Sequence, residues 1–378
     1  MHTLQSGMGW FPEQTGGLNR VFFNLMEYLP SVGVGAEGLV AGSQQVDIDS
    51  EGRVRAFARG EAPLPVRWLR ARQQATERLE TGRFDLVASH FALYSLPFID
   101  AVAPRPLVVH FHGPWAAESA VEGAASWAVS FKRRLERAVY DRADRFIVLS
   151  QAFKQVLSTT YGVPLALIEV CQGGVNVDAY DTGLTRAYAR HSLGWPSDRP
   201  IILAVRRLAR RMGLENLLEA VDAVRIKLPD VLLLIAGKGP IAEELAARIE
   251  TMDLGNHVRL LGFVPDADLP LAYRAADLSV VPTVSLEGFG LITVESLAAG
   301  TPVLVTPVGG LPEILEGLAP QLILPDTSPG ALAEGIRESL LGTLGLPDAN
   351  ACRSYAREHY DWSVAAARVR DVYREVLG

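Results

Sequence analysis

Short apolar runs alternate along the whole chain with stretches in which apolar residues recur at helical spacing. In the first half the runs are Ala36–Gly42, Phe84–His90, Pro106–Phe111, Arg145–Ser150 and Leu167–Gln172. In the second half they are Pro200–Val205, Val231–Ala236, His257–Gly262, Asp277–Pro282 and Pro302–Thr306. Alternation of strand and helix predicts parallel sheets that are covered on both faces by helices. Val231–Ala236 contains no polar residue, as expected of a strand buried on both faces.

The length of 378 residues, of which 49% are hydrophobic and 21% charged, predicts two folded domains. We place the boundary in Gly173–Asn176, which gives an N-terminal domain over 1–175 and a C-terminal domain over 176–360. Apolar residues at helical spacing predict a last helix within 361–378. The expected fold is therefore α/β, with two Rossmann-like doubly wound sheets facing a central cleft at the carboxyl ends of their strands.

Charge and cysteine content exclude several classes of protein. The net charge is −7, and the first 172 residues carry 17 basic and 17 acidic side chains, so no domain is basic enough for general nucleic-acid binding. Cys171 and Cys352 have no neighbouring cysteine, which argues against a zinc site and favours a reducing cytoplasm. No apolar run approaches the roughly 20 residues of a membrane span, and the N-terminus lacks the pattern of a signal peptide.

The most informative segment is Val281–Glu313. An apolar strand ends at Pro282, a turn with two glycines follows, and a helix is predicted from about Leu291. Free N–H groups and the positive end of the helix dipole form a site for a diphosphate or a sugar hydroxyl. Glu287 on the loop and Glu295 in the first turns of the helix could hold vicinal hydroxyls of one ligand. The alternative is that both are surface acids favoured near a helix N-terminus.

This segment resembles the Glu-x7-Glu signature of glycosyltransferase family 4. The order Pro-x-x-x-x-Glu-Gly-Phe-Gly and the later Gly309, Gly310 and Glu313 also match. The resemblance covers nearly the entire chain and is strongest after Ile201. It implies the GT-B architecture of two Rossmann-like domains and a hexosyltransferase-like enzyme that transfers a sugar from a nucleotide-sugar with retention of anomeric configuration. It also implies that the last helix, within 361–378, crosses back to the first domain.

The resemblance also implies roles for individual residues. Glu295 would bind the ribose of the nucleotide, and Glu287 would lie near the donor sugar as a catalytic residue. Backbone N–H groups of the turn would hold sugar hydroxyls or phosphate; the residues of the turn are Gly288, Phe289, Gly290 and Leu291.

Four arginines follow the strand that ends at Val205. Clustered cations repel each other unless an anion or carboxylates meet them, and arginine binds phosphate in a bidentate fork. The segment is similar to the family pattern Gly-Arg-Leu-x-x-x-Lys-Gly, which makes Arg207 the predicted diphosphate ligand. The chain departs from the pattern at Arg206, in place of glycine, and at Met212, in place of lysine. We therefore expect Arg211 to supply the second cation; a solvated basic turn is the alternative.

Further candidates lie on other loops. Gly16 and Gly17 precede a helical pattern and let a ligand approach the backbone, although paired glycines often mark only a turn. By the resemblance this loop faces phosphates and acceptor, and His112, after a strand, touches the donor sugar; His110 is expected to be structural. Three more positions border the nucleotide by the same resemblance: Gly237, Phe263 and Val264.

The predicted reaction is transfer of a sugar from a nucleotide-diphosphate sugar, with a UDP- or GDP-sugar as the expected donor, to a hydroxyl acceptor that is a glycan, a lipid-linked molecule or a small molecule. We expect no metal, because no third ligand accompanies the two histidines. Two alternatives stay open. One is a relative that interconverts nucleotide-sugars without an acceptor, such as an epimerase. The other is a non-catalytic binding subunit, which Met212 favours.

Residues 53–83 contain eight arginines and three acids, and Lys132, Arg133, Arg134 and Arg137 form a second basic stretch. Such patches suit an anionic acceptor or contact with an anionic membrane. A solvated helical face is the alternative. The expected location is the cytoplasm, with the inner face of the membrane as the site of any peripheral contact.

Overall fold

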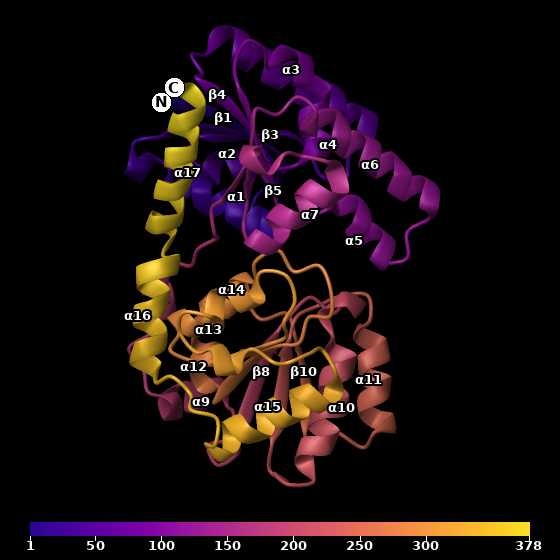
Figure 1. Ribbon diagram of the computed structural model, residues 1–378, viewed down its shortest axis with the longest axis vertical. Helices are drawn as coiled ribbons and strands as arrows, with labels where there is room; N and C mark the ends of the chain where they lie inside the picture. The colour runs from indigo at the N-terminus through magenta and orange to yellow at the C-terminus, as the bar shows by residue number, and fades with distance from the viewer. The chain divides into compact units, whose positions relative to one another are not determined.

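The computed structural model describes residues 1–378, and the chain divides into two compact units. Unit 1 comprises Met1–Gly173 together with Trp362–Gly378, and unit 2 comprises Gly174–Asp361. Each unit contains one parallel sheet with helices packed around it (Figure 1). The predicted α/β class, with two doubly wound parallel sheets, is confirmed.

Unit 1 contains a seven-stranded sheet in the order β3-β2-β1-β4-β5-β6-β7. Its strands are β1 (His2–Gly9), β2 (Gly35–Ala41), β3 (Val54–Ala58), β4 (Leu86–Ser89), β5 (Leu107–Phe111), β6 (Arg145–Val148) and β7 (Ile168–Val170). Its helices are α1 (Gly17–Tyr28), α2 (Gln45–Asp49), α3 (Leu64–Thr81), α4 (Ala92–Ser95), α5 (Trp115–Val121), α6 (Ser126–Tyr140), α7 (Gln151–Tyr161) and α17 (Trp362–Leu377).

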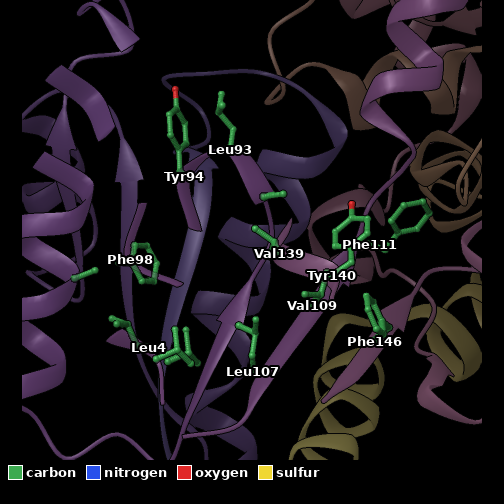
Figure 2. Close-up of a cluster of buried hydrophobic side chains, with 14 of the residues drawn as sticks. Leu4, Leu93, Tyr94, Phe98, Leu107, Val109, Phe111, Val139, Tyr140 and Phe146 are labelled. Carbon is green, nitrogen blue, oxygen red and sulfur yellow. The ribbon is translucent and has the colours of Figure 1, made fainter. Parts of the chain in front are cut away.

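The core of unit 1 forms where the apolar strands β4 to β6 meet α6 and α7. Figure 2 shows the aromatic side chains of Phe111, Tyr140 and Phe146 gathered on this side of the sheet. Their rings lie at edge-to-face angles with centroids 5.8 to 6.1 Å apart, a geometry that aromatic pairs prefer. The last helix, α17, packs against α1 and so belongs to this unit.

Unit 2 contains a five-stranded parallel sheet in the order β10-β9-β8-β11-β12. Its strands are β8 (Ile201–Val205), β9 (Leu232–Ala236), β10 (Val258–Gly262), β11 (Leu278–Val281) and β12 (Val303–Val305). Its helices are α8 (Val177–Tyr180), α9 (Arg186–Leu193), α10 (Leu214–Arg225), α11 (Ala242–Thr251), α12 (Leu269–Ala275), α13 (Leu291–Ala298), α14 (Leu311–Leu315), α15 (Pro329–Leu341) and α16 (Ala349–Tyr360). Every residue of β9 is buried, which explains its lack of polar alternation.

The strand order reverses once in each sheet. In unit 1 the reversal lies between β1 and β4, and in unit 2 it lies between β8 and β11. At such a switch point the loops leaving two neighbouring strands run in opposite directions and open a crevice at their carboxyl ends. The loops after β8 and β11 carry the arginines and Glu287, and α13, which follows the β11 loop, carries Glu295. The topology therefore brings the strongest candidates of unit 2 to one edge of its sheet.

The basic stretch 53–83 contains a strand, β3, and a long helix, α3. Four of its arginines are engaged within unit 1. Arg53 pairs with Glu27, Arg72 with Asp100 and Arg78 with Glu37, and Arg67 donates to the hydroxyl of Tyr94. No helix of the chain is both long and apolar enough to cross a bilayer.

Candidate functional site

The loops at the carboxyl edge of the unit 2 sheet are tied together through their backbones. Gly237, directly after β9, has φ +147°, and a Cβ atom built on it would lie 1.8 Å from the carbonyl oxygen of Arg206. Its N–H donates to the carbonyl of Gly262 at 2.7 Å, and the N–H of Leu208 donates to the carbonyl of Lys238 at 3.0 Å. Only glycine fits at position 237, because any side chain would push the β8 loop away.

A buried ion pair joins the loop after β8 to the loop after β11. Nη2 of Arg206 lies 2.6 Å from Oε2 of Glu287, and the two side chains are 6% and 15% exposed. The same nitrogen lies 2.6 Å from Oγ1 of Thr283, whose hydroxyl donates to Oε2 of Glu287 at 3.2 Å. The arginine that replaces the family glycine is therefore not part of a solvated turn, which corrects that alternative for position 206.

The other three arginines of the cluster have different surroundings. Arg211 donates from Nη1 to the carbonyl of Leu286 at 2.8 Å and so holds the β11 loop. Arg210 is 63% exposed and pairs with Glu244 at 2.7 Å. Arg207 is exposed. Carboxylates thus meet at least two of the four cations, Arg206 and Arg210.

The main chain of Glu287 is fixed from the next loop of the sheet. The N–H of Gly310 donates to the Glu287 carbonyl at 3.1 Å. Gly309 has φ +58°, and a Cβ atom there would lie 1.8 Å from the same carbonyl oxygen. The glycine pair after β12 is thus required for two loops to approach each other, which gives a physical reason for that part of the signature.

The turn that precedes α13 has the geometry predicted from the sequence. Gly290 is the N-cap of the helix, with φ +94° and no capping side chain. Phe289 is buried, and its ring centroid lies 5.8 Å from that of Tyr360. Gly288 and Leu291 are half-buried. The helix therefore presents first-turn N–H groups that no side chain of the N-cap residue satisfies.

Glu295 lies in the second turn of α13 and is 4% exposed. The hydroxyl of the fully buried Tyr273, on α12, donates to Oε2 of Glu295 at 3.2 Å. A buried carboxylate is costly unless hydrogen bonds hold it. This burial contradicts the alternative in which Glu295 is an ordinary surface acid. Its predicted role toward ribose stays a prediction.

Two loop residues of the predicted nucleotide site are near the surface. Phe263 is 51% exposed, an unusual position for a large aromatic side chain, and Val264 is half-buried. The Lys238 ammonium lies 5.5 Å from the centroid of the Phe263 ring. An exposed aromatic face beside a cation is available to stack on a base.

The candidates of unit 1 lie on the segments that follow β1 and β5, at the carboxyl edge of its sheet. Gly16 and Gly17 are exposed at the start of α1, and a Cβ atom on either would meet nothing within 4 Å. The buried Asn19 fixes the preceding loop, because it accepts from the N–H of Gly9 at 3.1 Å and donates to the carbonyl of Gln14 at 3.1 Å. The first turn of α1 is consequently open to a ligand.

His112 belongs to a cluster of three histidines. Its Nε2 lies 3.0 Å from Nδ1 of His90, whose Nε2 lies 3.0 Å from Oε1 of Gln5. His90 and His110 stack with centroids 4.1 Å apart, and Nε2 of His110 lies 2.7 Å from the hydroxyl of Tyr373. His110 is thus a buried packing residue, in line with the structural role expected for it.

The hydrogen bonds assign the tautomers of this cluster. Because the Gln5 carbonyl oxygen can only accept, Nε2 of His90 donates to it and Nδ1 of His90 accepts from His112. Nδ1 of His112 is then left as an acceptor. Burial lowers the pKa of His112 to about 4 and holds the pKa values of His90 and His110 well below their usual range. All three rings are therefore neutral near pH 7.

Several residues of these sites escaped sequence reasoning. His90 follows a strand as a single histidine, and Gln5, Tyr273 and Tyr373 belong to no motif, so their partners could be found only from the fold. Arg206 was noticed as a departure from the family pattern, but its pairing with Glu287 was not anticipated. No group of three or more His, Cys, Asp or Glu side chains is arranged to hold a metal ion.

Comparison with known proteins assigns the chain to a family. Residues 185–359 match the family described as Glycosyl transferases group 1, and residues 15–179 match Glycosyltransferase Family 4. The chain is 30% identical over 240 residues to an uncharacterized glycosyltransferase of Methanocaldococcus jannaschii, a match that covers 61% of each protein. It is 30% identical over 316 residues to D-inositol 3-phosphate glycosyltransferase of Corynebacterium glutamicum, over 79% of this chain and 74% of that protein.

Solved structures agree on the fold. The complex of the Anabaena protein HepE with UDP-glucose superimposes with a TM-score of 0.81 at 21% identity, over 99% of this chain and 100% of that chain. At this identity the likeness concerns the architecture. Together with the two family matches, it leads to one conclusion: the chain belongs to glycosyltransferase family 4 and is an enzyme of the two-domain GT-B fold.

Proposed function

We propose that this enzyme transfers a sugar from a nucleotide-diphosphate sugar to a hydroxyl acceptor, with retention of configuration and without a metal ion. The observation that carries the proposal is the carboxyl edge of the unit 2 sheet, where the buried Glu287 and Glu295 lie on the loop and helix after β11 and arginines follow β8. Acids suited to hydroxyl groups and cations suited to phosphate occur there together.

Unit 2 binds the donor in this proposal. Arg207 holds the diphosphate, Glu295 accepts from the ribose hydroxyls, and Glu287 accepts from the donor sugar. N–H groups at the start of α13 add fixed partial positive charge near the phosphates. The glycine-tied loops at Gly237 and at Phe263 and Val264 border the base. The UDP-glucose complex of the structural relative from Anabaena supports a UDP-sugar as the first donor to test.

Unit 1 binds the acceptor in this proposal. The exposed Gly16 and Gly17 turn would approach phosphate or acceptor through backbone N–H groups. The neutral His112 would accept a hydrogen bond from a sugar hydroxyl at Nδ1, since its Nε2 is used by His90. The name of the Corynebacterium relative supports D-inositol 3-phosphate as the first acceptor to test.

In the reaction, the bond between the anomeric carbon and the phosphate oxygen breaks, and its electron pair leaves with the nucleoside diphosphate. The acceptor oxygen bonds to the same carbon from the face that the phosphate vacates. Its proton goes to a phosphate oxygen, so that no enzyme nucleophile is needed. Cations that meet the growing charge on the phosphate lower the barrier.

The function is tested first by a thermal-shift screen with UDP, GDP and ADP and with UDP-glucose, GDP-mannose and ADP-glucose. A ligand that binds only the folded state raises the melting temperature, by an amount that grows with its concentration. Donor and D-inositol 3-phosphate are then incubated with the enzyme in EDTA. Formation of a product with the donor's anomeric configuration supports the proposal. Interconversion of the donor alone would instead indicate an epimerase.

We propose that the enzyme works in the cytoplasm and that α6 contacts an anionic membrane surface. Trp127 is 77% exposed and Phe131 is 48% exposed. With Arg134 they follow the spacing that places side chains on one face of a helix. Exposed aromatic groups beside basic residues suit the boundary of an anionic bilayer. The two cysteines are buried free thiols, which is compatible with a reducing compartment.

Co-sedimentation with vesicles tests the membrane contact. Wild-type protein is expected to pellet with phosphatidylglycerol vesicles and to stay in the supernatant with neutral phosphatidylcholine vesicles. The double variant Trp127→Ser/Phe131→Ser is expected to stay in the supernatant with both. The matched control is Arg70→Gln on α3, which removes an exposed cation outside α6 and should pellet as wild type does. Wild-type protein that stays in the supernatant with phosphatidylglycerol vesicles would refute the contact between α6 and the membrane.

A further inference from the structure

We propose that Arg206, and not Arg211, is the second cation that meets the donor's diphosphate when the glycosidic bond breaks. The inference rests on the proposed function and adds to it a residue that the family pattern does not contain. The guanidinium of Arg206 is buried at the strand-order reversal of unit 2, in direct contact with Glu287. Burying a charge is unfavourable, so the buried position of this cation needs a functional explanation.

The geometry of Arg206 leaves its Nε–H without an acceptor. Nη2 reaches Glu287 and Thr283, both at 2.6 Å. The Nε–H is buried and has no hydrogen-bond partner, which is true of several arginine Nε groups in the chain, so the contacts with Glu287 and Met212 distinguish Arg206. A buried N–H of a charged group that stays unpaired is unfavourable. A phosphate oxygen is the kind of acceptor that an unpaired guanidinium N–H accommodates best.

Met212 lies against the same end of Arg206. Its sulfur contacts Nη2 of Arg206, so the side chains of positions 206 and 212 reach one point from two places on the loop. The lysine side chain is one atom longer than the methionine side chain. A lysine at position 212 would therefore bring its ammonium to this point. The arginine at 206 therefore places a cation at the point that a lysine at 212 would reach, although the two positions are six residues apart in the sequence.

Arg211 holds the β11 loop through hydrogen bonds. Its Nη1 donates to the carbonyl of Leu286, a residue with φ +55°, and its own carbonyl accepts from the N–H of Val284 at 3.0 Å. These bonds brace the β11 loop in the conformation that presents Glu287. Arg211 is accordingly a positioning residue for this loop.

The charges also require a cation at the location of Arg206. The Glu287 carboxylate and the donor's diphosphate are both negative and would repel each other across the sugar. A cation shared between them removes this repulsion in the bound state. As the carbon–oxygen bond lengthens, charge grows on the phosphate, and an arginine already fixed by Glu287 and Thr283 needs no rearrangement to meet it.

The test compares the rate of donor cleavage in variants of the full-length enzyme, with the donor that the thermal-shift screen selects. We expect Arg206→Met to lower kcat by about 100-fold, as loss of one group that stabilises the transition state does. Adding Met212→Lys to an Arg206→Gly background should recover kcat to within about tenfold of wild type, because a cation returns to the same point. Arg211→Met should lose less kcat than Arg206→Met. The matched control is Arg210→Met, an exposed neighbour paired with Glu244, which should leave kcat unchanged.

Rescue by Met212→Lys separates a charge at the reacting phosphate from a merely structural role, because no repair of packing alone would restore kcat. If Arg206→Met fails to fold, Arg206→Lys and the Arg206→Gly/Met212→Lys variant decide, since both keep a cation there. A folded Arg206→Met enzyme with wild-type kcat, a larger loss in Arg211→Met, or no recovery in the double variant would overturn the inference. A wild-type enzyme that binds none of the nucleotides would refute the proposed function itself.

Discussion

Oε2 of Glu287 and Nη2 of Arg206 lie 2.6 Å apart and join the two loops that flank the strand-order reversal of unit 2. One partner comes from the loop after β8 and the other from the loop after β11, so neither loop can shift without breaking the pair. Thr283 completes the arrangement by accepting from the arginine and donating to the glutamate. Binding chemistry and the local stability of the site therefore depend on the same contact.

Replacing Glu287 by Gln should reduce both stability and turnover. The guanidinium of Arg206 would stay buried without a counter-charge, and removal of one partner of a buried pair costs about 3 kcal/mol. Urea unfolding measures this loss. The control is Glu244→Gln, which breaks the exposed pair with Arg210 and should cost less than about 1 kcal/mol. Equal losses in the two variants would contradict a buried pair at Glu287.

Replacing Glu295 by Gln should weaken nucleotide binding more than it slows turnover of bound donor. A hydrogen bond to a charged group contributes about 1.5–3 kcal/mol, which corresponds to a rise in Kd of roughly 10- to 100-fold. Calorimetric titration with UDP measures the change. Tyr273→Phe removes only the hydroxyl that holds this carboxylate and should have a smaller effect in the same direction. An unchanged Kd in Glu295→Gln would remove this residue from the nucleotide site.

Replacing Gly237 by Ala should destabilise unit 2 through the backbone. The new methyl group would lie 1.8 Å from the Arg206 carbonyl, and φ at this position is +147°. Strain of this kind costs on the order of 1–3 kcal/mol. The matched control is Gly255→Ala, where a Cβ atom meets nothing within 4 Å and φ is not in the left-handed region. Equal melting temperatures for both variants would argue against the close approach of the two loops.

His112 should stay neutral over the working pH range and should make the folded state sensitive to acid. Its pKa is lowered to about 4 by burial, below the value of about 6.5 in an unfolded chain. Between these values the unfolded state binds more protons, so the stability contributed by the neutral ring is complete above about pH 6.5 and is lost as the pH falls toward about 4. Urea unfolding at a series of pH values measures this loss.

His112→Gln keeps a donor toward His90 but cannot titrate. The difference in unfolding free energy between the two proteins should therefore change between pH 6.5 and pH 4.5, with the wild type losing more. Above pH 6.5 the difference should be constant, and protonation of His112 should cause no inflection in the rate profile between pH 6 and pH 8. Parallel stability curves for the two proteins would contradict the lowered pKa.

The fold was predictable because the apolar runs leave little choice. A run such as Leu232–Ala236, with no polar residue, is expected to form a strand buried on both faces, and the ten predicted runs lie within a few residues of ten of the twelve observed strands. Two strands match none of these runs: β1 contains polar residues such as Gln5, and two arginines interrupt or follow the short apolar pattern of β3. Unit 1 also buries polar residues of β1 such as Gln5, which hydrophobicity does not reveal but which bind the histidine cluster.

The sequence predicts which loops form the candidate sites, but it does not predict which side chains pair with each other there. Glycines at 237, 290 and 309 and the two glutamates indicated where backbone and carboxylates meet a ligand, and the structure gives the close approaches that require two of those glycines. Which of four clustered arginines would be buried could not be read from their spacing. That choice depends on Glu287, 81 positions away, and on the packing of Met212.

The central claim is that the carboxyl edge of the unit 2 sheet binds the nucleoside diphosphate of the donor. A crystal structure of the enzyme with UDP, or with whichever nucleoside diphosphate binds more tightly in the screen, tests it most directly. We predict electron density for the diphosphate beside Arg207 and Arg206 and for the ribose within hydrogen-bonding distance of Glu295. A nucleotide bound at full occupancy elsewhere on the protein, with these side chains untouched, would contradict the account.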